Sequence, residues 1–167
     1  MAEPARTPEP VALARVLVVG ADDARHRALV RSAEEELLVR YGGPGDTLET
    51  VSGAPLPEDA LRLLAVADET AVGCVAVTDR PEAGPAVGEV KRLWVHPSAR
   101  RRGLALALLT AAEDAARSRG HEELHLVTGT LQPEALALYE REGWRPIPAY
   151  AWADDPMTRC FAKPLRP

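Results

Sequence analysis

Three consecutive arginines, Arg100–Arg102, run into Gly103 and then into an almost unbroken apolar stretch. The preceding residues, LWV, are typical of a strand, and the following LALALL favours a helix. A helix begins with backbone N–H groups that lack an internal partner, and the helix dipole favours negative charge there. Gly103 and the small Ala105 would let a ligand come close to the backbone. The pattern therefore indicates a site for a phosphate or pyrophosphate.

Other interpretations of the arginines stay open. The chain has neither G-x-x-x-x-G-K-[ST] nor G-x-G-x-x-G after its first strand, so two common phosphate loops are excluded. The arginines could simply solvate the start of a helix, although cations there oppose the dipole unless an anion joins them. They could also contact nucleic acid, but a net charge of −5 and an aromatic content of 4% argue against that class.

The elements that must position this loop follow from hydrophobic periodicity and from glycine and proline breaks. We expect one long or two broken helices at 22–40, and further helices at 103–119 and 133–143. We expect strands at 15–20, 61–68, 71–79, 88–95 and 123–129, with short strand candidates at 144–150 and 157–165.

This order of elements predicts an α/β fold with a mixed, mostly antiparallel sheet and helices on its faces. Strands 61–68 and 71–79 should form a hairpin, and strands 88–95 and 123–128 should be parallel neighbours. Strand alternation places Glu89 on one face with Lys91 and Leu93. Helical spacing within 103–119 predicts an inner face of Leu104, Leu108, Ala111, Ala112 and Ala115, and an outer face of Thr110, Glu113, Asp114 and Arg117.

Length and composition place the chain among soluble globular proteins of one domain. With 167 residues, 46% of them hydrophobic, it can bury a real core; we expect a flexible tail at 1–14 and a single domain at 15–167. No apolar run approaches the roughly 18 residues of a membrane span, and the N-terminus has no apolar signal core, so we expect a cytoplasmic protein.

Cys74 and Cys160 lie in apolar segments without metal-ligand spacing, which predicts buried free thiols and no metal site.

Two sequence blocks together resemble the GNAT family of N-acetyltransferases. Arg100, Gly103 and Ala105 behind the strand LWV resemble that family's acetyl-CoA loop, and QPEALALYEREGW (132–144) resembles its late helix. The resemblance covers about residues 15–163 and implies an acyl-CoA N-acyltransferase fold with a sheet of six to seven strands and helices on both faces. The ending YAWADDPMTRCFAKPL resembles a bacterial subgroup that carries ADDP before its final strand.

The resemblance also implies roles for individual residues. Trp94 and Val95 would lie where the strand splays and its backbone pairs with the pantetheine arm of acetyl-CoA. The pyrophosphate would be bound mainly by backbone N–H groups of the loop, and Gln132 stands where many members have Asn. The cofactor-binding set is therefore Trp94, Val95, Arg100, Arg101, Arg102, Gly103, Leu104, Ala105, Gln132 and Tyr139.

Two residues are candidates for catalysis. Tyr139 matches the tyrosine that protonates the departing CoA thiolate, and Glu89 stands where some members place a carboxylate base that often acts through a water. A core tyrosine is the alternative for Tyr139. For Glu89 the alternative is a pairing with Lys91 or Arg92, or an exposed strand end. A backbone N–H near Val95 would serve as a donor to the thioester oxygen.

The acceptor side is less defined by the sequence. Asp154 and Asp155, beside Tyr150 and Trp152, could line a pocket for a cationic amine, or the aspartates could form an Asx-type turn before Pro156. The leading hypothesis is transfer of acetyl from acetyl-CoA to a primary amine of a small molecule or protein. A different acyl group and a non-catalytic CoA-binding regulatory module remain alternatives, and a homodimer is left open.

Overall fold

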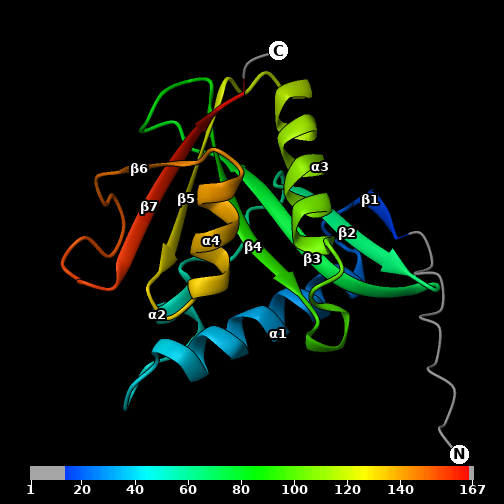
Figure 1. The fold of residues 1–167 in the computed structure, drawn as a ribbon, viewed down its shortest axis with the longest axis horizontal. Helices are drawn as coiled ribbons and strands as arrows, with labels where there is room; N and C mark the ends of the chain where they lie inside the picture. The colour runs from blue at the N-terminus through cyan, green and yellow to red at the C-terminus, as the bar shows by residue number, and fades with distance from the viewer. Residues whose placement is uncertain (1–13, 166–167) are drawn as a thin grey trace, which may run out of the picture.

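The structure, a computed structural model, describes residues 14–165 (Figure 1). Its helices are α1 (Ala24–Tyr41), α2 (Leu48–Ser52), α3 (Leu104–Ser118) and α4 (Pro133–Arg141), with a short 3-10 helix at Pro97–Ala99. Its strands are β1 (Arg15–Val19), β2 (Leu61–Ala67), β3 (Thr70–Asp79), β4 (Val87–Val95), β5 (Glu123–Gly129), β6 (Arg145–Ile147) and β7 (Thr158–Pro164). Of the tail predicted at 1–14, all but Ala14 lies outside the described residues.

The strands form one sheet of seven strands in the order β1-β2-β3-β4-β5-β7-β6. Every neighbouring pair is antiparallel except β4 and β5, which are parallel and joined through α3. The predicted hairpin, the parallel crossover and the mixed sheet are therefore confirmed. In the β2–β3 turn, Asp68 and Glu69 adopt φ values of 48° and 61°, the left-handed conformation that a two-residue hairpin turn requires.

Helices cover both faces of the sheet, as expected. In Figure 1, α3 and α4 lie in front of the strands, and α1 crosses the lower part of the molecule beside α2. Beneath α3 and α4 lies the larger apolar core, to which Leu108, Val90 and Phe161 belong. Leu29 of α1 packs on the opposite face against Leu64 and neighbouring side chains.

The N-terminal part of the chain differs from its prediction in two details. The helix expected at 22–40 is one continuous helix that spans Ala24–Tyr41, and its N-cap is Asp23, whose side chain accepts from the backbone N–H groups of Arg25 and His26. The short helix α2 was not predicted. It begins with a capping box in which Thr47 and Thr50 exchange side-chain and backbone hydrogen bonds.

The predicted outer face of α3 is wrong at one position. Glu113 is buried, with only 9% of its surface exposed, whereas Thr110, Asp114 and Arg117 are exposed as expected. Both carboxylate oxygens of Glu113 accept from Lys163 Nζ of β7 at 2.9 Å. A partner 50 residues away thus compensates a buried charge that helical spacing alone would place in solvent.

The described part of the chain holds no helix long and apolar enough to cross a membrane. Cys74 and Cys160 are buried free thiols, as predicted. Burial raises the pKa of the Cys74 thiol to about 12, so this side chain behaves as an apolar core residue.

The Glu113–Lys163 pair allows a test of the fold. Lys163→Ala leaves a buried carboxylate without its donor, so we expect the free energy of unfolding to fall by about 1–3 kcal/mol. Arg117→Ala breaks the more exposed pair with Asp114 on the same helix, and we expect a loss below about 0.5 kcal/mol. Urea denaturation of both variants measures the difference, and equal losses would contradict the structural role of Lys163.

Candidate functional site

The site is built around the place where β4 and β5 stop pairing. Their parallel register runs from Val87 opposite Glu123 to Val90 opposite Leu126, and no pairing between them is recorded beyond that point in the described residues. Both strands continue, to Val95 and to Gly129. A cavity of about 940 Å³ opens between them and is lined by residues from both faces of the sheet.

A β-bulge in β4 sets the orientation of the strand along this opening. Cys74 of β3 pairs with Trp94 and Ala76 pairs with Lys91, so Val75 alone lies opposite both Arg92 and Leu93. Arg92 adopts a φ of 56°, and its guanidinium bonds to Glu34 of α1 at 3.0 Å and to the carbonyl of Ala54 at 3.0 Å.

The bulge changes the strand alternation that the sequence suggests. Leu93 packs against the core beneath α3 and α4, whereas Arg92 and Trp94 bond to residues of α1 on the other face. The expectation that Leu93 shares a face with Glu89 is therefore wrong, because the extra residue of a bulge reverses the alternation beyond it.

The loop after β4 presents the N-terminus of α3 to the cavity. Arg101 and Gly103 have φ values of 63° and 75°, and Arg101 and Arg102 are exposed. Gly103 is the N-cap, and no described side chain caps the helix. The first N–H groups of α3, at Leu104 and Ala105, are consequently available to a ligand, and both residues line the cavity. Arg102 does not line it.

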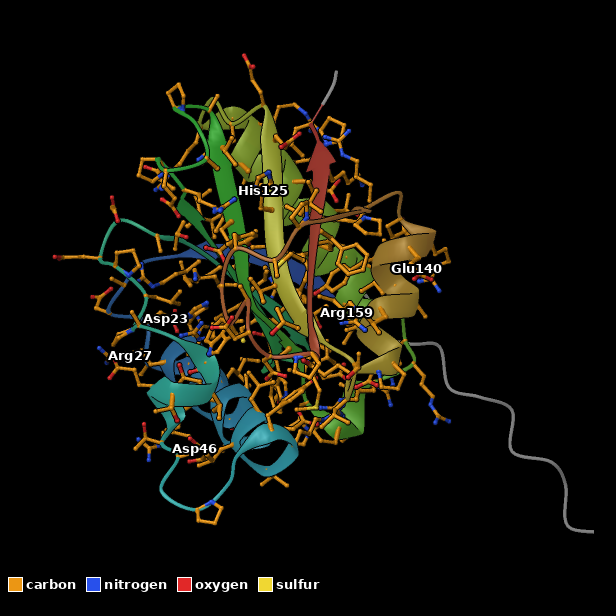
Figure 2. All side chains as sticks on the ribbon, turned by 90° about the vertical axis from the view of Figure 1, so that its left-hand side faces the viewer. Asp23, Arg27, Asp46, His125, Glu140 and Arg159 are labelled. Carbon is orange, nitrogen blue, oxygen red and sulfur yellow. The ribbon has the colours of Figure 1, made fainter. Side chains whose placement is uncertain are left out.

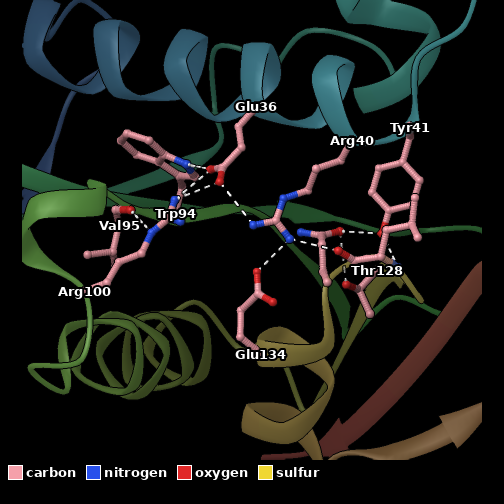
Figure 3. Close-up of polar contacts among 10 residues, drawn as sticks. Glu36, Arg40, Tyr41, Trp94, Val95, Arg100, Thr128 and Glu134 are labelled. Carbon is pink, nitrogen blue, oxygen red and sulfur yellow. Dashed lines mark hydrogen bonds and ion pairs between the residues drawn. The ribbon is translucent and has the colours of Figure 1, made fainter.

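Arg100 has a different environment from the other two arginines. Its Nε donates to the carbonyl of Val95 at 2.9 Å, and its terminal nitrogen donates to both oxygens of Glu36 at 3.0 and 2.7 Å (Figure 3). The guanidinium also lies 5.8 Å from the centroid of the Trp94 ring. Arg100 therefore joins the end of β4 to α1, and its side chain is already engaged within the protein.

Glu36 is the shared acceptor of this cluster. It also accepts from the indole Nε1 of Trp94 and from Arg40 at 3.2 Å. Burial opposes the ionised form of Glu36, but the hydrogen bonds from Arg100 and Trp94 outweigh that effect and lower the pKa of its carboxyl below the ordinary value.

Arg40 and Tyr41 extend the connection from α1 to the other side of the opening. Arg40 donates to the carbonyl of Leu131 at 2.9 Å and pairs with Glu134 of α4 at 2.7 Å. The Tyr41 hydroxyl donates to Gln132 at 3.3 Å, as Figure 3 shows. Gln132 lines the cavity, and its side-chain oxygen already accepts this hydrogen bond from within the protein.

The two catalytic candidates lie on opposite faces of the sheet. Tyr139 belongs to the core beneath α3 and α4, with ring centroids 5.8 Å from Trp144 and 6.0 Å from Phe161. Glu89 precedes Val90, which faces that same core, so alternation directs Glu89 to the other face. Both residues line the cavity, and the opening between β4 and β5 brings the two faces together.

Both catalytic candidates also show the structural features that the alternative interpretations predicted, which are core burial for Tyr139 and an ion pair for Glu89. Tyr139 is 6% exposed, and burial raises the pKa of its hydroxyl well above the ordinary value. Glu89 pairs with Lys91 at 3.1 Å, as one alternative expected, and it also accepts from the Tyr150 hydroxyl at 3.1 Å.

The four acceptor-side candidates divide into two pairs. Trp152 and Asp155 line the cavity, whereas Tyr150 and Asp154 do not. The indole of Trp152 donates to the carbonyl of Thr50 at 3.2 Å and so ties the β6–β7 loop to α2. Asp155 accepts from the N–H of Met157 at 2.8 Å, which is the Asx-type turn that the sequence left open.

Sequence reasoning missed Glu36, Arg40 and Tyr41. The one available signal was the i, i+4 spacing of Glu36 and Arg40, which predicts an ion pair within a helix. That spacing gives no indication of the contact between Glu36 and Arg100, because these two residues lie 64 positions apart in the chain.

Comparisons with known proteins agree on one family. The family model described as "Acetyltransferase (GNAT) family" matches residues 27–144. An IAA acetyltransferase of Azospirillum brasilense is 36% identical over an alignment of 143 residues, which covers 83% of this chain and 91% of the relative.

Solved structures show the same fold. A Klebsiella pneumoniae protein assigned to the acyl-CoA N-acyltransferases matches with a TM-score of 0.74 and 28% identity, over 92% of this chain and 99% of that one. The PaiA N-acetyltransferase of Thermoplasma acidophilum, solved with coenzyme A, matches with a TM-score of 0.66 and 16% identity, over 91% and 99%.

The Glu36 cluster predicts a specific loss of stability. Glu36→Ala removes the shared acceptor of Arg100 and Trp94, so we expect unfolding to become easier by about 1–3 kcal/mol. Glu35→Ala changes the adjacent residue, whose pair with Arg31 is exposed, and should cost less than about 0.5 kcal/mol. Urea denaturation compares the two, and a Glu36 variant as stable as the Glu35 variant would show that the cluster does not hold the opening together.

Proposed function

The chain belongs to the GNAT acetyltransferase family, and from this premise we propose how its cavity transfers acetyl from acetyl-CoA to a primary amine. The observation that carries the proposal is the opening between β4 and β5, where residues from both faces of the sheet line one cavity. Acetyl-CoA enters from the face of α3 and α4, and the amine enters from the face of α1 and α2. The two substrates meet in the opening as a ternary complex.

The uncapped N-terminus of α3 binds the pyrophosphate of acetyl-CoA. Backbone N–H groups at Gly103, Leu104 and Ala105 supply the hydrogen bonds, and the helix dipole adds to them. Arg101 and Arg102 contribute attraction from exposed positions. Arg100 acts differently, because its guanidinium is bound to Glu36 and Val95 and supports the loop from within.

The backbone of Val95 donates to the thioester oxygen. His96 donates its N–H to Val72 of β3, so the alternation of an antiparallel ladder directs the N–H of Val95 away from β3 and toward the opening. A donor held there stabilises the negative charge that develops on the oxygen as the amine attacks. The backbone at Trp94 and Val95 also faces the pantetheine arm.

Glu89 and Tyr139 handle the two proton transfers. Glu89 takes a proton from the amine nitrogen, directly or through a water, and the C–N bond forms as the tetrahedral adduct develops. The C–S bond then breaks, and Tyr139 donates its proton to the CoA thiolate, whose thiol has an ordinary pKa of about 8.5. The raised pKa of the Tyr139 hydroxyl keeps that proton in place until the thiolate appears.

The proposal also covers the wall that binds the acceptor amine and the subgroup to which the chain belongs. The apolar side chains of Leu37, Val51, Trp152 and Met157 line the amine side of the cavity together with Asp155. The ADDP segment at 153–156 lies in the β6–β7 loop on this side and supports a place in the bacterial subgroup that it resembles.

Acetyl-CoA binding and amine turnover test the function directly. Acetyl-CoA should raise the melting temperature of the purified protein, because a ligand that binds only the folded state stabilises it. Thiol detection across a panel of small amines, peptides with a free amine, and IAA should then reveal CoA release with at least one acceptor. Absence of stabilisation by acetyl-CoA, together with salt-sensitive binding to DNA, would overturn the proposal.

Gly103→Ala tests the pyrophosphate loop. A Cβ at Gly103 meets no atom within 4 Å, so the change adds only the strain of a left-handed backbone, about 1–2 kcal/mol. We expect the KM for acetyl-CoA to rise about 5–30-fold, since the loop must hold this conformation to bind.

Gly120→Ala is the matched control for that variant. Gly120 lies at the other end of α3 with a φ of 92°, and a Cβ there also meets no atom within 4 Å. It should lower stability by a similar amount and leave the KM for acetyl-CoA unchanged. An equal rise in KM for both variants would mean that the effect comes from α3 stability and not from the loop.

Tyr139→Phe tests the general acid. The variant keeps the aromatic packing against Trp144 and Phe161, so kcat should fall on the order of 100-fold while the affinity for acetyl-CoA changes little. Steady-state kinetics and calorimetry measure the two quantities. An unchanged kcat at all pH values would show that Tyr139 is only a core residue.

A further inference from the structure

The β6–β7 loop places Tyr150 against Glu89, away from the acetyl-CoA loop. The Tyr150 hydroxyl donates to one carboxylate oxygen of Glu89 at 3.1 Å, and Lys91 Nζ lies 3.1 Å from the other oxygen. The side chain of Glu89 is 12% exposed. Both oxygens of the proposed base are therefore oriented by a neighbour, one from its own strand and one from a loop 61 residues later.

Arg80, at the end of β3, holds the Tyr150 ring in place. The guanidinium carbon of Arg80 lies 3.4 Å from the centroid of the ring, which is the geometry of a cation–π contact. Arg80 is only 8% exposed, so its charge has been removed from water to stack on this ring. A buried cation is costly without compensation, and Tyr150 provides part of it.

A second contact fixes the position of Arg80. Its Nη1 hydrogen-bonds to Nδ1 of His125, and Nε2 of His125 lies 2.6 Å from Glu123. Because a guanidinium only donates, Nδ1 of His125 accepts and Nε2 carries the proton that it donates to Glu123. His125 lies within β5, directly opposite Glu89 in the parallel register.

These residues form a polar chain, Glu123–His125–Arg80–Tyr150–Glu89, that joins β5, the turn after β3, the β6–β7 loop and β4. Figure 2 shows His125 on the face of the sheet that the β6–β7 loop crosses. None of the roles assigned to the pyrophosphate loop or to Tyr139 uses this chain. It ends at the carboxylate of Glu89, which borders the cavity.

We propose that Tyr150 is a positioning residue for the base: its hydroxyl, fixed by Arg80, orients the Glu89 carboxylate. The proposal rests on the proposed role of Glu89. The charged and titratable groups around Glu89 are Lys91 of β4, His125 of β5, Arg80 after β3, and Tyr150 of the loop. Of these, Tyr150 and Lys91 touch the carboxylate itself.

The chemistry of Tyr150 suits this role. Burial and the neighbouring carboxylate raise the pKa of its hydroxyl well above the ordinary value, so Tyr150 stays a neutral donor. A donor to a carboxylate favours the charged form, which is the form that can accept a proton. The same loop carries Trp152 and Asp155 on the cavity wall, so the acceptor wall and the orientation of the base depend on one segment.

The test combines a titration of Glu89 with turnover. Tyr150→Phe keeps the ring that Arg80 stacks on and removes only the hydroxyl. In protein carrying ¹³C-labelled glutamate carboxyls, with Glu89 assigned by its loss in Glu89→Gln, NMR should show Glu89 titrating at higher pH in the variant. The sign follows because loss of a donor disfavours the anion. We expect kcat to fall about 10-fold or more, with the KM for acetyl-CoA unchanged.

Two controls separate this role from a structural one. Tyr41→Phe removes a hydroxyl on the far side of the cavity and should not change the pH at which Glu89 titrates. Arg80→Ala should lower kcat, and adding Tyr150→Phe to it should cost less than it does in the wild type, because both act through one contact.

The outcomes distinguish this inference from the proposed function. An unshifted titration of Glu89 with an unchanged kcat in Tyr150→Phe would overturn the positioning role. If the titration shifts but Tyr150→Phe and Glu89→Gln both turn over at the wild-type rate, the base assignment fails and the positioning role in catalysis fails with it. Acetyl-CoA stabilisation and CoA release would still stand in that case.

Discussion

The end of parallel pairing at Val90 is the constraint on which the rest of the molecule depends. Beyond it β4 and β5 separate, and an opening through a sheet is a place where two layers of helices can line one cavity. Such an opening leaves backbone groups without strand partners, so it persists only if other contacts hold the strands apart. The bulge at Arg92 and the Arg100–Val95 hydrogen bond supply those contacts on the β4 side.

Helix α1 holds the two sides of the opening at a fixed distance. Glu36 binds Arg100 and Trp94 on the β4 side, and one turn later Arg40 binds Leu131 and Glu134 on the β5 side. The same turn brings Tyr41 onto the backbone of β5 at Gly129, where a Cβ would lie 2.4 Å from the tyrosine hydroxyl oxygen. Glu36 also neutralises Arg100, one of the three arginines in the loop before α3.

Charge is arranged by face of the sheet. The face under α3 and α4 carries the larger apolar core, which includes Tyr139, together with the buried Glu113–Lys163 pair, whereas the opposite face carries the ion pairs of α1 and the polar chain that ends at Glu89. This separation suits a reaction in which an apolar acyl arm meets a polar amine.

The sequence by itself determined the features that depend on neighbouring residues. Gly103 between a strand and a helix indicated a helix N-terminus whose backbone a ligand can approach, and Pro133 and Gly143 bounded the next helix. These patterns are local, so propensity and spacing are sufficient to find them. Only the tertiary structure decided that Arg100 bonds to Glu36, that Lys163 pairs with Glu113, and that the Tyr150 hydroxyl donates to Glu89. Those contacts join residues 50 to 64 positions apart. The bulge at Arg92 likewise reverses the strand alternation that would have placed Leu93 on the face of Glu89. Long-range polar contacts depend on which strands become neighbours and in what register, and no local pattern in the chain encodes that geometry.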